Sequence, residues 1–291
     1  MGLSIPFHDF NGEFVNSSQK LANTELKSNE SLKKYCNYLF EQQEKGELPC
    51  EMDLQLFKSD IENNIYFNSS IPQGFGVGSS GALVAAVYGK YAKHPINPSD
   101  AIAGDNFKDL KITLGKLENF FHGKSSGLDP LICYLNLPVL IKDKEHLGAV
   151  DMPKNDAEGK GAIFLINSGN PGHTQSMVAI FLQKLKNRGF RNLFKTELKQ
   201  LNDDCIQDFL KGDFAGLFTN LKGLSSFFLQ NFKPMIPAHF EKEWQEGIDT
   251  NKYYLKLCGS GGGGYILGFT QDLEQASQHL RKHKLNIIHR F

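Results

Sequence analysis

A glycine-rich stretch ahead of an apolar segment constrains this chain more than any other part of its sequence. Residues 71–82 read Ile-Pro-Gln-Gly-Phe-Gly-Val-Gly-Ser-Ser-Gly-Ala, and residues 83–88 follow with the composition of a helix start. Glycine adopts positive φ and lets the backbone approach a ligand closely. Free N–H groups at a helix start, with the positive end of the helix dipole, attract anions. The stretch therefore predicts either a phosphate-binding loop or a tight turn before a core helix.

Two common nucleotide-binding motifs do not account for this stretch. No Gly-Lys-Ser/Thr closes it, which excludes a Walker A loop. Residues 76–81 match G-x-G-x-x-G, and Asp100 lies at a suitable spacing for a ribose contact, but a Rossmann turn leaves its strand directly. Here Ser69, Ser70 and Pro72 follow the apolar run at 64–67, and proline breaks a strand.

Length and composition indicate an ordinary globular protein. The 291 residues are 40% hydrophobic and 22% charged, which argues against disorder and allows one large or two smaller domains. The formal net charge of zero favours neither a nucleic-acid nor a membrane partner, and no apolar run reaches the ~18 residues of a membrane span. Five scattered cysteines without C-x-x-C predict reduced thiols in a cytoplasmic protein.

Hydrophobic periodicity predicts a mixture of helices and strands. We expect a hairpin around Asn11-Gly12 and a helix from Ser28 or Asn29 to Gly46. Further helices are expected after the glycine-rich loop to about 91, from about 104 to 121, from 174 to 185 and at 273–284, and strands at 137–141, 162–166, 253–257, 265–269 and 285–288. The polar residues 150–160 predict a boundary between domains 1–155 and 156–291.

Two acidic residues flank a glycine-containing turn downstream of the loop. Phosphoryl transfer needs a phosphate cradle, Mg²⁺ ligands and a group that orients or deprotonates the acceptor. A serine hydroxyl and a carboxylate are suitable hard-oxygen ligands for Mg²⁺. Glu118 and Asp129 supply two carboxylates, although each also fits a structural role, Glu118 as a solvated helix residue and Asp129 as a helix cap before Pro130.

Three motifs, in order along the chain, resemble those of the GHMP small-molecule kinases and, within that family, of bacterial mevalonate kinases of the flavobacterial type. Residues 72–81 match P-x-G-x-G-[LV]-G-S-S-[AG], and residues 256–264 match K-L-[CT]-G-[AS]-G-G-G-G. The pattern E-x-x-x-H-G-x-x-S-G-x-D is matched by Glu118, His122, Gly123, Ser126, Gly127 and Asp129. The resemblance covers essentially the whole chain. It implies an α+β GHMP kinase fold, with a ribosomal-protein-S5-like N-terminal domain and a ferredoxin-like C-terminal domain.

The resemblance also implies an activity, namely ATP- and Mg²⁺-dependent phosphorylation of the primary hydroxyl of mevalonate in isoprenoid precursor synthesis. Asp129 would be the base, and Ser80 and Glu118 would hold Mg²⁺. ATP would contact Ser69, Gly74, Phe75, Gly76, Val77, Gly78, Ser79, Ser80, Gly259, Ser260, Gly261 and Gly262. Mevalonate would contact His122, Gly123, Ser126 and Thr174. Its carboxylate ligand is not indicated, and Lys124 is a guess.

The chain departs from the family pattern at three places. Ser125 stands where many relatives have proline, and Pro171-Gly-His-Thr174 lacks the arginine of animal relatives. The first family motif, a strand with a lysine followed by Gly-Glu, is absent, because residues 2–6 align with what normally comes after it. We therefore expect a truncated chain or a relative with impaired activity, with an exposed sheet edge that could pair in a homodimer. Another GHMP kinase, acting on phosphomevalonate or a sugar, and a non-catalytic nucleotide-binding relative stay open as alternatives.

Overall fold

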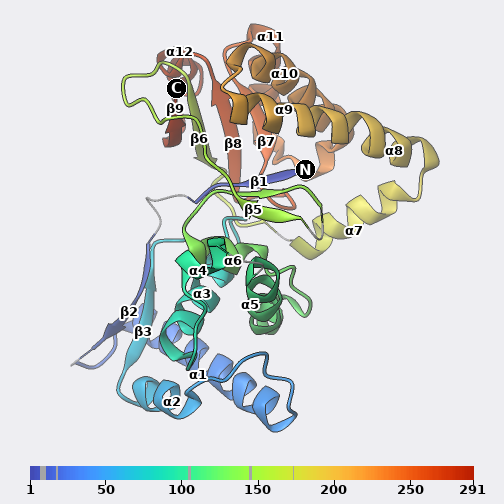
Figure 1. Cartoon of the computed structure of the whole chain (residues 1–291). Coiled ribbons are helices and arrows are strands. Elements are labelled where there is room, and N and C mark those ends of the chain that lie inside the picture. The colour runs from blue at the N-terminus through green and yellow to red at the C-terminus, as the bar shows by residue number, and fades with distance from the viewer. Residues whose placement is uncertain (7–10, 18, 104–105, 144–145, 173) are drawn as a thin grey trace.

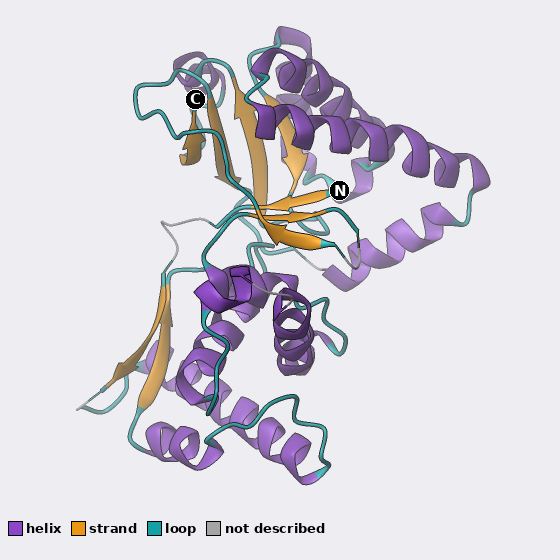
Figure 2. Cartoon of the chain, viewed as in Figure 1, coloured by secondary structure: helices purple, strands orange, loops and turns teal. Residues whose placement is uncertain are grey.

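The chain folds into a mainly helical N-terminal half and a C-terminal half built on one sheet, with strand β1 (Gly2–Ser4) between them (Figure 1). The structure is a computed structural model, and it describes residues 1–6, 11–17, 19–103, 106–143, 146–172 and 174–291. Figure 2 shows helices forming most of the N-terminal half, whereas strands occupy the middle of the C-terminal half.

The N-terminal half packs its helices around one apolar core. The helices are α1 (Asn23–Glu44), α2 (Leu54–Glu62), α3 (Ser79–Tyr91), α4 (Pro98–Ala103), α5 (Asn106–His122) and α6 (Leu128–Leu135). In α1, buried residues recur at helical spacing at Leu32, Tyr35, Cys36 and Leu39, as the sequence predicts. They meet buried residues of α2, α3, α5 and α6, among them Phe57, Val84, Leu110 and Leu131.

Helix α1 begins earlier than predicted, at Asn23 instead of Ser28 or Asn29. Both residues lie inside the helix, and their side chains bind the neighbouring strand instead of capping. Ser28 Oγ donates to the carbonyl of Phe67 at 2.9 Å, and Asn29 Nδ2 donates to the carbonyl of Ile65 at 2.6 Å. Polar side chains that favour caps can also sit within a helix where a strand offers carbonyl groups.

The predicted N-terminal hairpin is wrong. Strand β1 pairs with β4 (Val139–Ile141), which pairs with β5 (Leu147–Ala149), and all three are antiparallel. Strand β2 (Gly12–Asn16) pairs instead with β3 (Ile65–Ser69). The Asn11-Gly12 signal is local, whereas the pairing follows burial: the Phe14 ring packs 5.4 Å from that of Phe67 and 5.8 Å from that of Tyr91. Residues 7–10 lie outside the described structure.

The C-terminal half contains a four-stranded antiparallel sheet in the order β7-β8-β6-β9. The strands are β6 (Ala162–Asn167), β7 (Tyr254–Leu257), β8 (Tyr265–Thr270) and β9 (Leu285–Arg290), close to the predicted ranges. With β6 counted as the first strand, the spatial order is that of a ferredoxin-like β-α-β-β-α-β unit. Most of the helices lie between β6 and β7 along the chain.

Between β6 and β7 lie α7 (Thr174–Leu185), α8 (Arg188–Leu193), α9 (Lys199–Lys211), α10 (Phe214–Asn231) and α11 (Glu241–Thr250), with a π-helical turn η1 (Phe194–Leu198) and two 3₁₀ turns, η2 (Lys233–Met235) and η3 (Ala238–Phe240). Helix α12 (Leu273–His279) lies between β8 and β9. The 3₁₀ turn η2 contains Pro234 and η3 directly follows Pro237, because proline interrupts the hydrogen bonding of a regular helix. Helix α12 is shorter than the predicted 273–284. No helix in the described part of the chain is long and apolar enough to cross a membrane.

Alternation along the central strand β6 gives the sheet two different faces. Phe164 and Ile166 join the buried cluster around Trp244 of α11, whereas Ile163 joins a second cluster with Phe209 of α9 and Leu221 of α10. The division into domains 1–155 and 156–291 stays a prediction. The fully buried residues of the N-terminal core end at Val139 and those of the C-terminal sheet begin at Ala162, but Leu3 and Ile5 of the N-terminal segment pack against the second C-terminal cluster.

Candidate active site

The glycine-rich loop ends at the first turn of α3 with its backbone donors available. Gly76 and Gly78 have φ of 72° and 77°, a region that residues with a Cβ rarely adopt, and Gly78 is the N-cap of α3. Among the described residues, the backbone N–H groups of Gly76, Val77 and Gly78 donate to no protein acceptor. The loop therefore presents free donors at the positive end of a helix, as an anion site requires.

Asp129 lies against this loop, in the first turn of α6. A Cβ added at Gly78 would lie 3.6 Å from the Cβ of Asp129, and one at Gly81 would lie 2.7 Å from the backbone carbon of Asp129. The close approach of α3 and α6 at Gly81 thus brings the acid to the loop. Gly127, with φ of 73°, is the N-cap of α6, so Asp129 is not the helix cap that its sequence position also allowed.

Ser80 and Glu118 form a polar network beside the loop. Ser80 Oγ donates to Glu118 Oε1 at 2.8 Å and lies 2.9 Å from His122 Nε2. Glu118 is only 3% exposed, so it is not the solvated helix residue that its sequence position also allowed. Ser125 Oγ donates to the other carboxylate oxygen, and the N–H of Gly127 donates to Ser125 Oγ at 2.9 Å. A buried carboxylate is thus held from both sides by hydroxyl groups.

The pKa of Asp129 is raised above its ordinary value. The first cause is desolvation, because protein atoms surround the carboxyl group although it faces an open cavity. The negative charge of Glu118 raises the pKa further, and His122 acts in the opposite direction. An accessible acid with a raised pKa is the expected property of a proton acceptor that works near neutral pH.

A second glycine loop, between β7 and β8, contacts the first one. The N–H of Tyr265 donates to the carbonyl of Phe75 at 3.0 Å, and a Cβ added at Gly259 would lie 3.8 Å from the Cα of Gly76. The N–H of Gly172 donates to the carbonyl of Gly74 at 2.8 Å. Segments far apart in the sequence therefore meet at residues 74–76.

Not every donor of the second loop is free. The N–H of Gly261 donates to the carbonyl of Cys258 at 3.2 Å, and that of Gly262 donates to the carbonyl of Met235 at 2.6 Å. These two amides bind protein and would have to break these bonds to reach a phosphate. The N–H groups of Gly259 and Ser260 donate no such bond among the described residues. Of the four residues of this loop predicted to contact ATP, these two are therefore the better placed to bind a phosphate.

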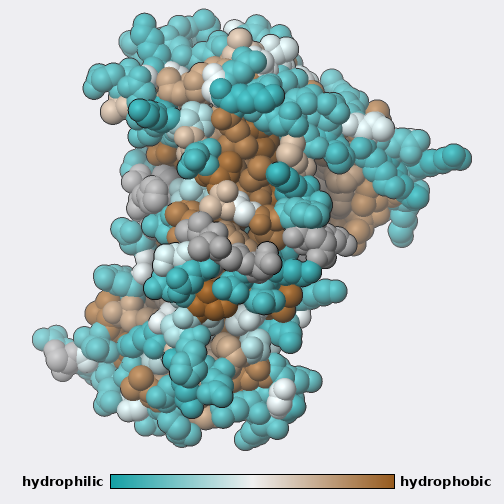
Figure 3. All heavy atoms as spheres, in the orientation of Figure 1, coloured by the Kyte–Doolittle hydropathy of each residue, from teal (hydrophilic) through white to brown (hydrophobic). Residues whose placement is uncertain are grey.

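A cavity of about 820 Å³ opens beside Asp129, between the two halves. Gly76, Gly78, Asp129 and Cys133 line one side, and apolar side chains of β6, β8, β9, α9 and α10 line the other. In Figure 3, hydrophobic side chains gather in the middle of the visible face, over the C-terminal sheet. The volume is within the range of pockets that hold small molecules.

Other predicted residues lie farther from this centre. Ser69 ends β3 and is exposed, with its Oγ accepting from the N–H of Ile71 at 3.1 Å. His122 lies beside Ser80, whereas Gly123 and Ser126 are exposed in the turn that follows and do not line the cavity. Lys124, the guessed carboxylate ligand, does not line it either. Thr174 begins α7, but its side chain lies outside the described structure.

Sequence reasoning missed two residues of the site. Ser125, treated as a minor departure from proline, binds the Glu118 carboxylate. Lys256 was noted only as part of a motif, and it lines the cavity together with Cys258. The signal for Ser125 was a hydroxyl residue between two required positions of the motif. Alternation along β7 could have placed Lys256 opposite the buried Leu255 and Leu257, although not in a cavity.

Comparisons with known proteins agree with this architecture. Residues 50–136 match the model of the GHMP kinases N terminal domain. Three solved structures share the fold: the Lin0012 protein from Listeria innocua (15% identity, TM-score 0.57, covering 93% of this chain and 80% of that chain), L. major mevalonate kinase in complex with R-mevalonate (14%, 0.56, 87% and 79%) and Streptococcus pneumoniae phosphomevalonate kinase in complex with phosphomevalonate and AMPPNP (13%, 0.54, 94% and 85%). No curated protein matches the sequence. The α+β fold of the chain is that of the GHMP kinases, as predicted.

Proposed function

We propose that this chain, which has the fold of the GHMP kinases, transfers the γ-phosphate of ATP to the primary hydroxyl of mevalonate. The observation that carries the proposal is the position of the Asp129 carboxyl group. It lies against the glycine-rich loop and close enough to Glu118 for that negative charge to raise its pKa. A phosphate cradle and a base of raised pKa at one point are the parts that phosphoryl transfer needs.

The proposed reaction uses Asp129 as proton acceptor. As the O–H bond of the acceptor breaks, its proton passes to the Asp129 carboxylate, and the alcohol oxygen forms a bond to the γ-phosphorus. The bond from that phosphorus to the bridging oxygen breaks, which releases ADP. The raised pKa makes Asp129 a stronger base than an ordinary aspartate.

The glycine-rich loop supports binding of the triphosphate. Its free N–H groups and the start of α3 offer fixed partial positive charge, which needs no reorganisation when charge moves during transfer. Gly259 and Ser260 of the second loop supply further donors from the opposite half.

The donor set at Ser80 and Glu118 fits Mg²⁺. A hydroxyl and a carboxylate are hard oxygen ligands, and Mg²⁺ at nucleotide sites takes one or two protein carboxylates and completes its shell with phosphates and water. When bound, Mg²⁺ supplies positive charge that offsets the charge of the phosphoryl oxygens. Ser125 keeps the Glu118 carboxylate in place.

Mevalonate is proposed as the acceptor because the segment from Glu118 to Asp129 carries the mevalonate kinase pattern. One of the solved structures that share the fold is a mevalonate kinase bound to R-mevalonate. A phosphomevalonate kinase shares the fold to a similar degree, so the acceptor is tested with a panel.

The test is ADP release by the purified chain with ATP and Mg²⁺. We expect ADP in proportion to added mevalonate, and little with phosphomevalonate, homoserine or galactose. ADP formation with one of the other acceptors alone would assign a different kinase. Stabilisation by ATP in a thermal-shift measurement without ADP from any acceptor would show a nucleotide-binding protein that is not an enzyme.

A further inference from the structure

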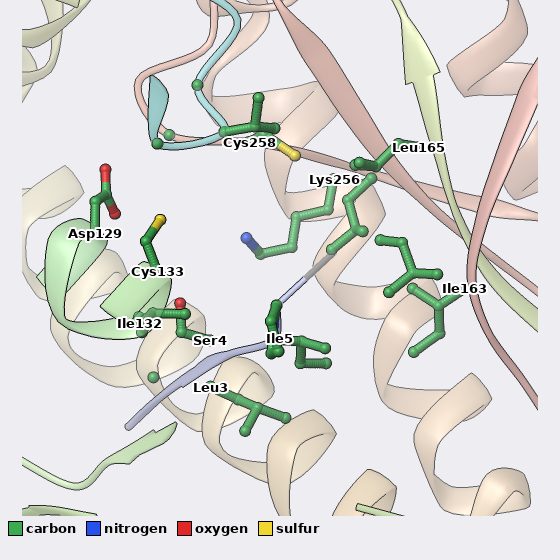
Figure 4. Close-up of a pocket in the computed structure, with 18 of the residues that line it drawn as sticks. Leu3, Ser4, Ile5, Asp129, Ile132, Cys133, Ile163, Leu165, Lys256 and Cys258 are labelled. Carbon is green, nitrogen blue, oxygen red and sulfur yellow. The ribbon is translucent and has the colours of Figure 1, made fainter. Parts of the chain in front are cut away.

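The cavity beside Asp129 has one polar and one apolar end. Its apolar wall includes Leu165, Leu267, Phe269 and Ile288 of the C-terminal sheet, Leu221 of α10 and Ile5 of the N-terminal segment. Figure 4 shows Asp129 and Cys133 on one side of the cavity, Ile163 and Leu165 on the other, and Ile5 of the N-terminal segment between them. A ligand that fills this space must therefore carry both polar groups and a carbon skeleton.

Lys256 brings a positive charge between these two ends. It comes from β7, and in Figure 4 its amine points toward the side where Asp129 and Cys133 lie. Its hydrogen-bond partner is the carbonyl of the next residue, Leu257, at 3.3 Å. Among the described residues, no carboxylate oxygen lies within 4.0 Å of Lys256 Nζ, although surface lysines such as Lys90 and Lys233 have such partners.

An ammonium group in this position is costly without an anion. Lys256 is half-buried, and removing a charge from water without a counter-ion is strongly unfavourable. Its charge reaches the thiols of Cys205 and Cys258, where it opposes the burial that raises their pKa values to about 12 and about 11. The amine therefore acts inside the cavity. Its two partners, the carbonyl of Leu257 at 3.3 Å and the Phe228 ring with its centroid at 5.7 Å, carry no net negative charge that would neutralise it.

The lining distinguishes between acceptor classes. A sugar presents hydroxyl groups all round and needs many hydrogen-bond partners, but most of the lining side chains are aliphatic or aromatic. An amino-acid alcohol brings an ammonium group next to Lys256, where like charges repel. A short aliphatic acid with a terminal hydroxyl fits the lining better, with its carboxylate at Lys256, its carbon chain against the apolar wall and its hydroxyl at Asp129.

We propose that Lys256 binds the carboxylate of the acceptor, and that the acceptor is a small aliphatic hydroxy acid whose hydroxyl lies at Asp129 and whose carbon chain lies against the sheet. This assignment rests on the proposed phosphotransfer and makes Lys256 a specificity-determining residue. It replaces Lys124, which does not line the cavity.

The first experiment compares two acceptors on the wild-type chain. Mevalonate is matched with 3-methylpentane-1,3,5-triol, in which a neutral CH₂OH replaces the carboxylate. A hydrogen bond to a charged group corresponds to a factor of about 10 to 100 in affinity, so we expect KM for the triol to exceed that for mevalonate by this factor. Equal KM values would overturn the proposal without the need for any variant.

The second experiment removes the charge. We expect Lys256→Met to raise KM for mevalonate about 10- to 100-fold with kcat within a few-fold, and to make the two acceptors equivalent. Lys256→Arg should retain the preference for mevalonate. The matched control is Lys252→Met, which removes the same charge from an exposed position four residues away and should change neither value. Unchanged selectivity in Lys256→Met would overturn the assignment, since a merely structural lysine would not affect the choice between acceptors.

A failure of this proposal is separable from a failure of the proposed function. If the wild-type chain releases no ADP with either acceptor, phosphotransfer is wrong, and calorimetric binding of mevalonate still tests Lys256. Binding that is lost in Lys256→Met and kept in Lys252→Met would support the carboxylate ligand. The same Kd in all three proteins, or no binding to the wild-type chain, would overturn it.

Discussion

Asp129 combines two properties that seldom coincide, an accessible carboxyl group and a raised pKa. The cavity leaves its oxygens open to a ligand, while the surrounding protein and the charge of Glu118 disfavour ionisation. The same residue at a flat surface would be an ordinary weak base. Its chemistry is thus a consequence of where α6 places it.

We predict that Asp129→Asn abolishes most of the activity and leaves nucleotide binding intact. The amide keeps the shape of the side chain but cannot accept the hydroxyl proton, and a general base contributes about 10²- to 10⁴-fold. The measurements are kcat with mevalonate and thermal stabilisation by an ATP analogue. Asp151→Asn, at an exposed acid outside the cavity, is the control. A near-normal kcat in Asp129→Asn would rule out the role of base.

We expect the buried side chain of His289 on β9 to lower the stability of the folded chain. Its side chain is 3% exposed, and Nε2 is buried with no hydrogen-bond partner in the part of the chain that the structure describes. Its ring packs edge-to-face against Phe209, with centroids 5.6 Å apart. Burial lowers the pKa of His289 below the ordinary 6.5, because the charged form is poorly solvated there.

We predict that His289→Phe stabilises the chain, and more so in acid. Between pH 6.5 and the lower pKa of the folded state, the unfolded chain binds a proton that the folded chain does not, so wild-type stability falls as pH falls through this window. Above pH 6.5 the wild-type chain loses no stability through protonation. There only the unpaired nitrogen lowers the free energy of unfolding, by about 1 kcal/mol. Urea unfolding at pH 8 and pH 5.5 measures both terms. His94→Gln, at an exposed histidine, should show no such gain, and an equal effect of His289→Phe at both pH values would contradict the assignment.

At the scale of single elements, the pairing of α3 with α6 decides where the acid lies. Gly81 is buried on α3 and lies directly against the backbone of Asp129 and Pro130. A side chain there would separate the helices and move the carboxyl group away from the loop. The absence of a side chain at Gly81 therefore allows α3 and α6 to pack closely.

We predict opposite effects for the same substitution at two positions of α3. In Gly81→Ala the new Cβ would lie 2.7 Å from the backbone of α6, which we expect to cost about 1–3 kcal/mol and to lower kcat. In Gly89→Ala the Cβ meets only the Tyr134 ring at 3.4 Å, and the better helix propensity should stabilise by up to about 1 kcal/mol. Thermal unfolding of both variants is the measurement. If Gly81→Ala proved as stable as Gly89→Ala, the close approach of the helices would be wrong.

Helix α12 ends earlier than predicted and contacts α11 through two histidines. His279 and His283 are four residues apart, and both fall within the predicted helix 273–284. The helix stops at His279, whose Nδ1 lies 2.6 Å from Glu246 Oε1, and His283 Nε2 lies 2.9 Å from Glu243 Oε2. Both glutamates belong to α11, so the two histidines tie neighbouring elements together.

At the scale of the whole molecule, the two halves join where their glycine loops meet. Phe75 accepts a hydrogen bond from Tyr265, and Gly74 accepts one from Gly172. The Phe75 and Tyr265 rings lie 5.7 Å apart. Since the same loop offers its free donors to an anion, the contact between the halves and the proposed nucleotide site share one segment.

We predict that Gly264→Ala disturbs this junction more than backbone strain alone would. Gly264 has φ of 78°, and a Cβ there would lie 2.5 Å from the carbonyl oxygen of Phe75. Gly212 has φ of 72° with open space around it, so Gly212→Ala reports the strain alone, about 1 kcal/mol. We expect Gly264→Ala to lose more stability and also to bind an ATP analogue more weakly. Equal losses in the two variants, with equal binding, would show that the junction does not support the loop.

The local features of this protein could be predicted from its sequence because they depend on neighbouring residues. The helix after the glycine-rich loop, the amphipathic α5 and the strands of the C-terminal sheet all lie close to the predicted ranges. Glycine spacing and apolar periodicity depend on residues close together in the chain, so they can be recognised in the sequence alone. The two carboxylates were found in the same way, as parts of a short motif.

Only the tertiary structure determines which residues lie across the cavity from these carboxylates. Leu3, Ile163, Lys256 and Ile288 line one cavity although they are spread over nearly the whole chain. Alternation along a strand assigns a residue to one face of a sheet, but not to a cavity or to a particular partner. The wrong hairpin at Asn11-Gly12 has the same origin, since strand pairing is chosen by burial between distant segments. A motif thus specifies the chemistry of a few groups, whereas the packing of the two halves determines which molecule can reach them.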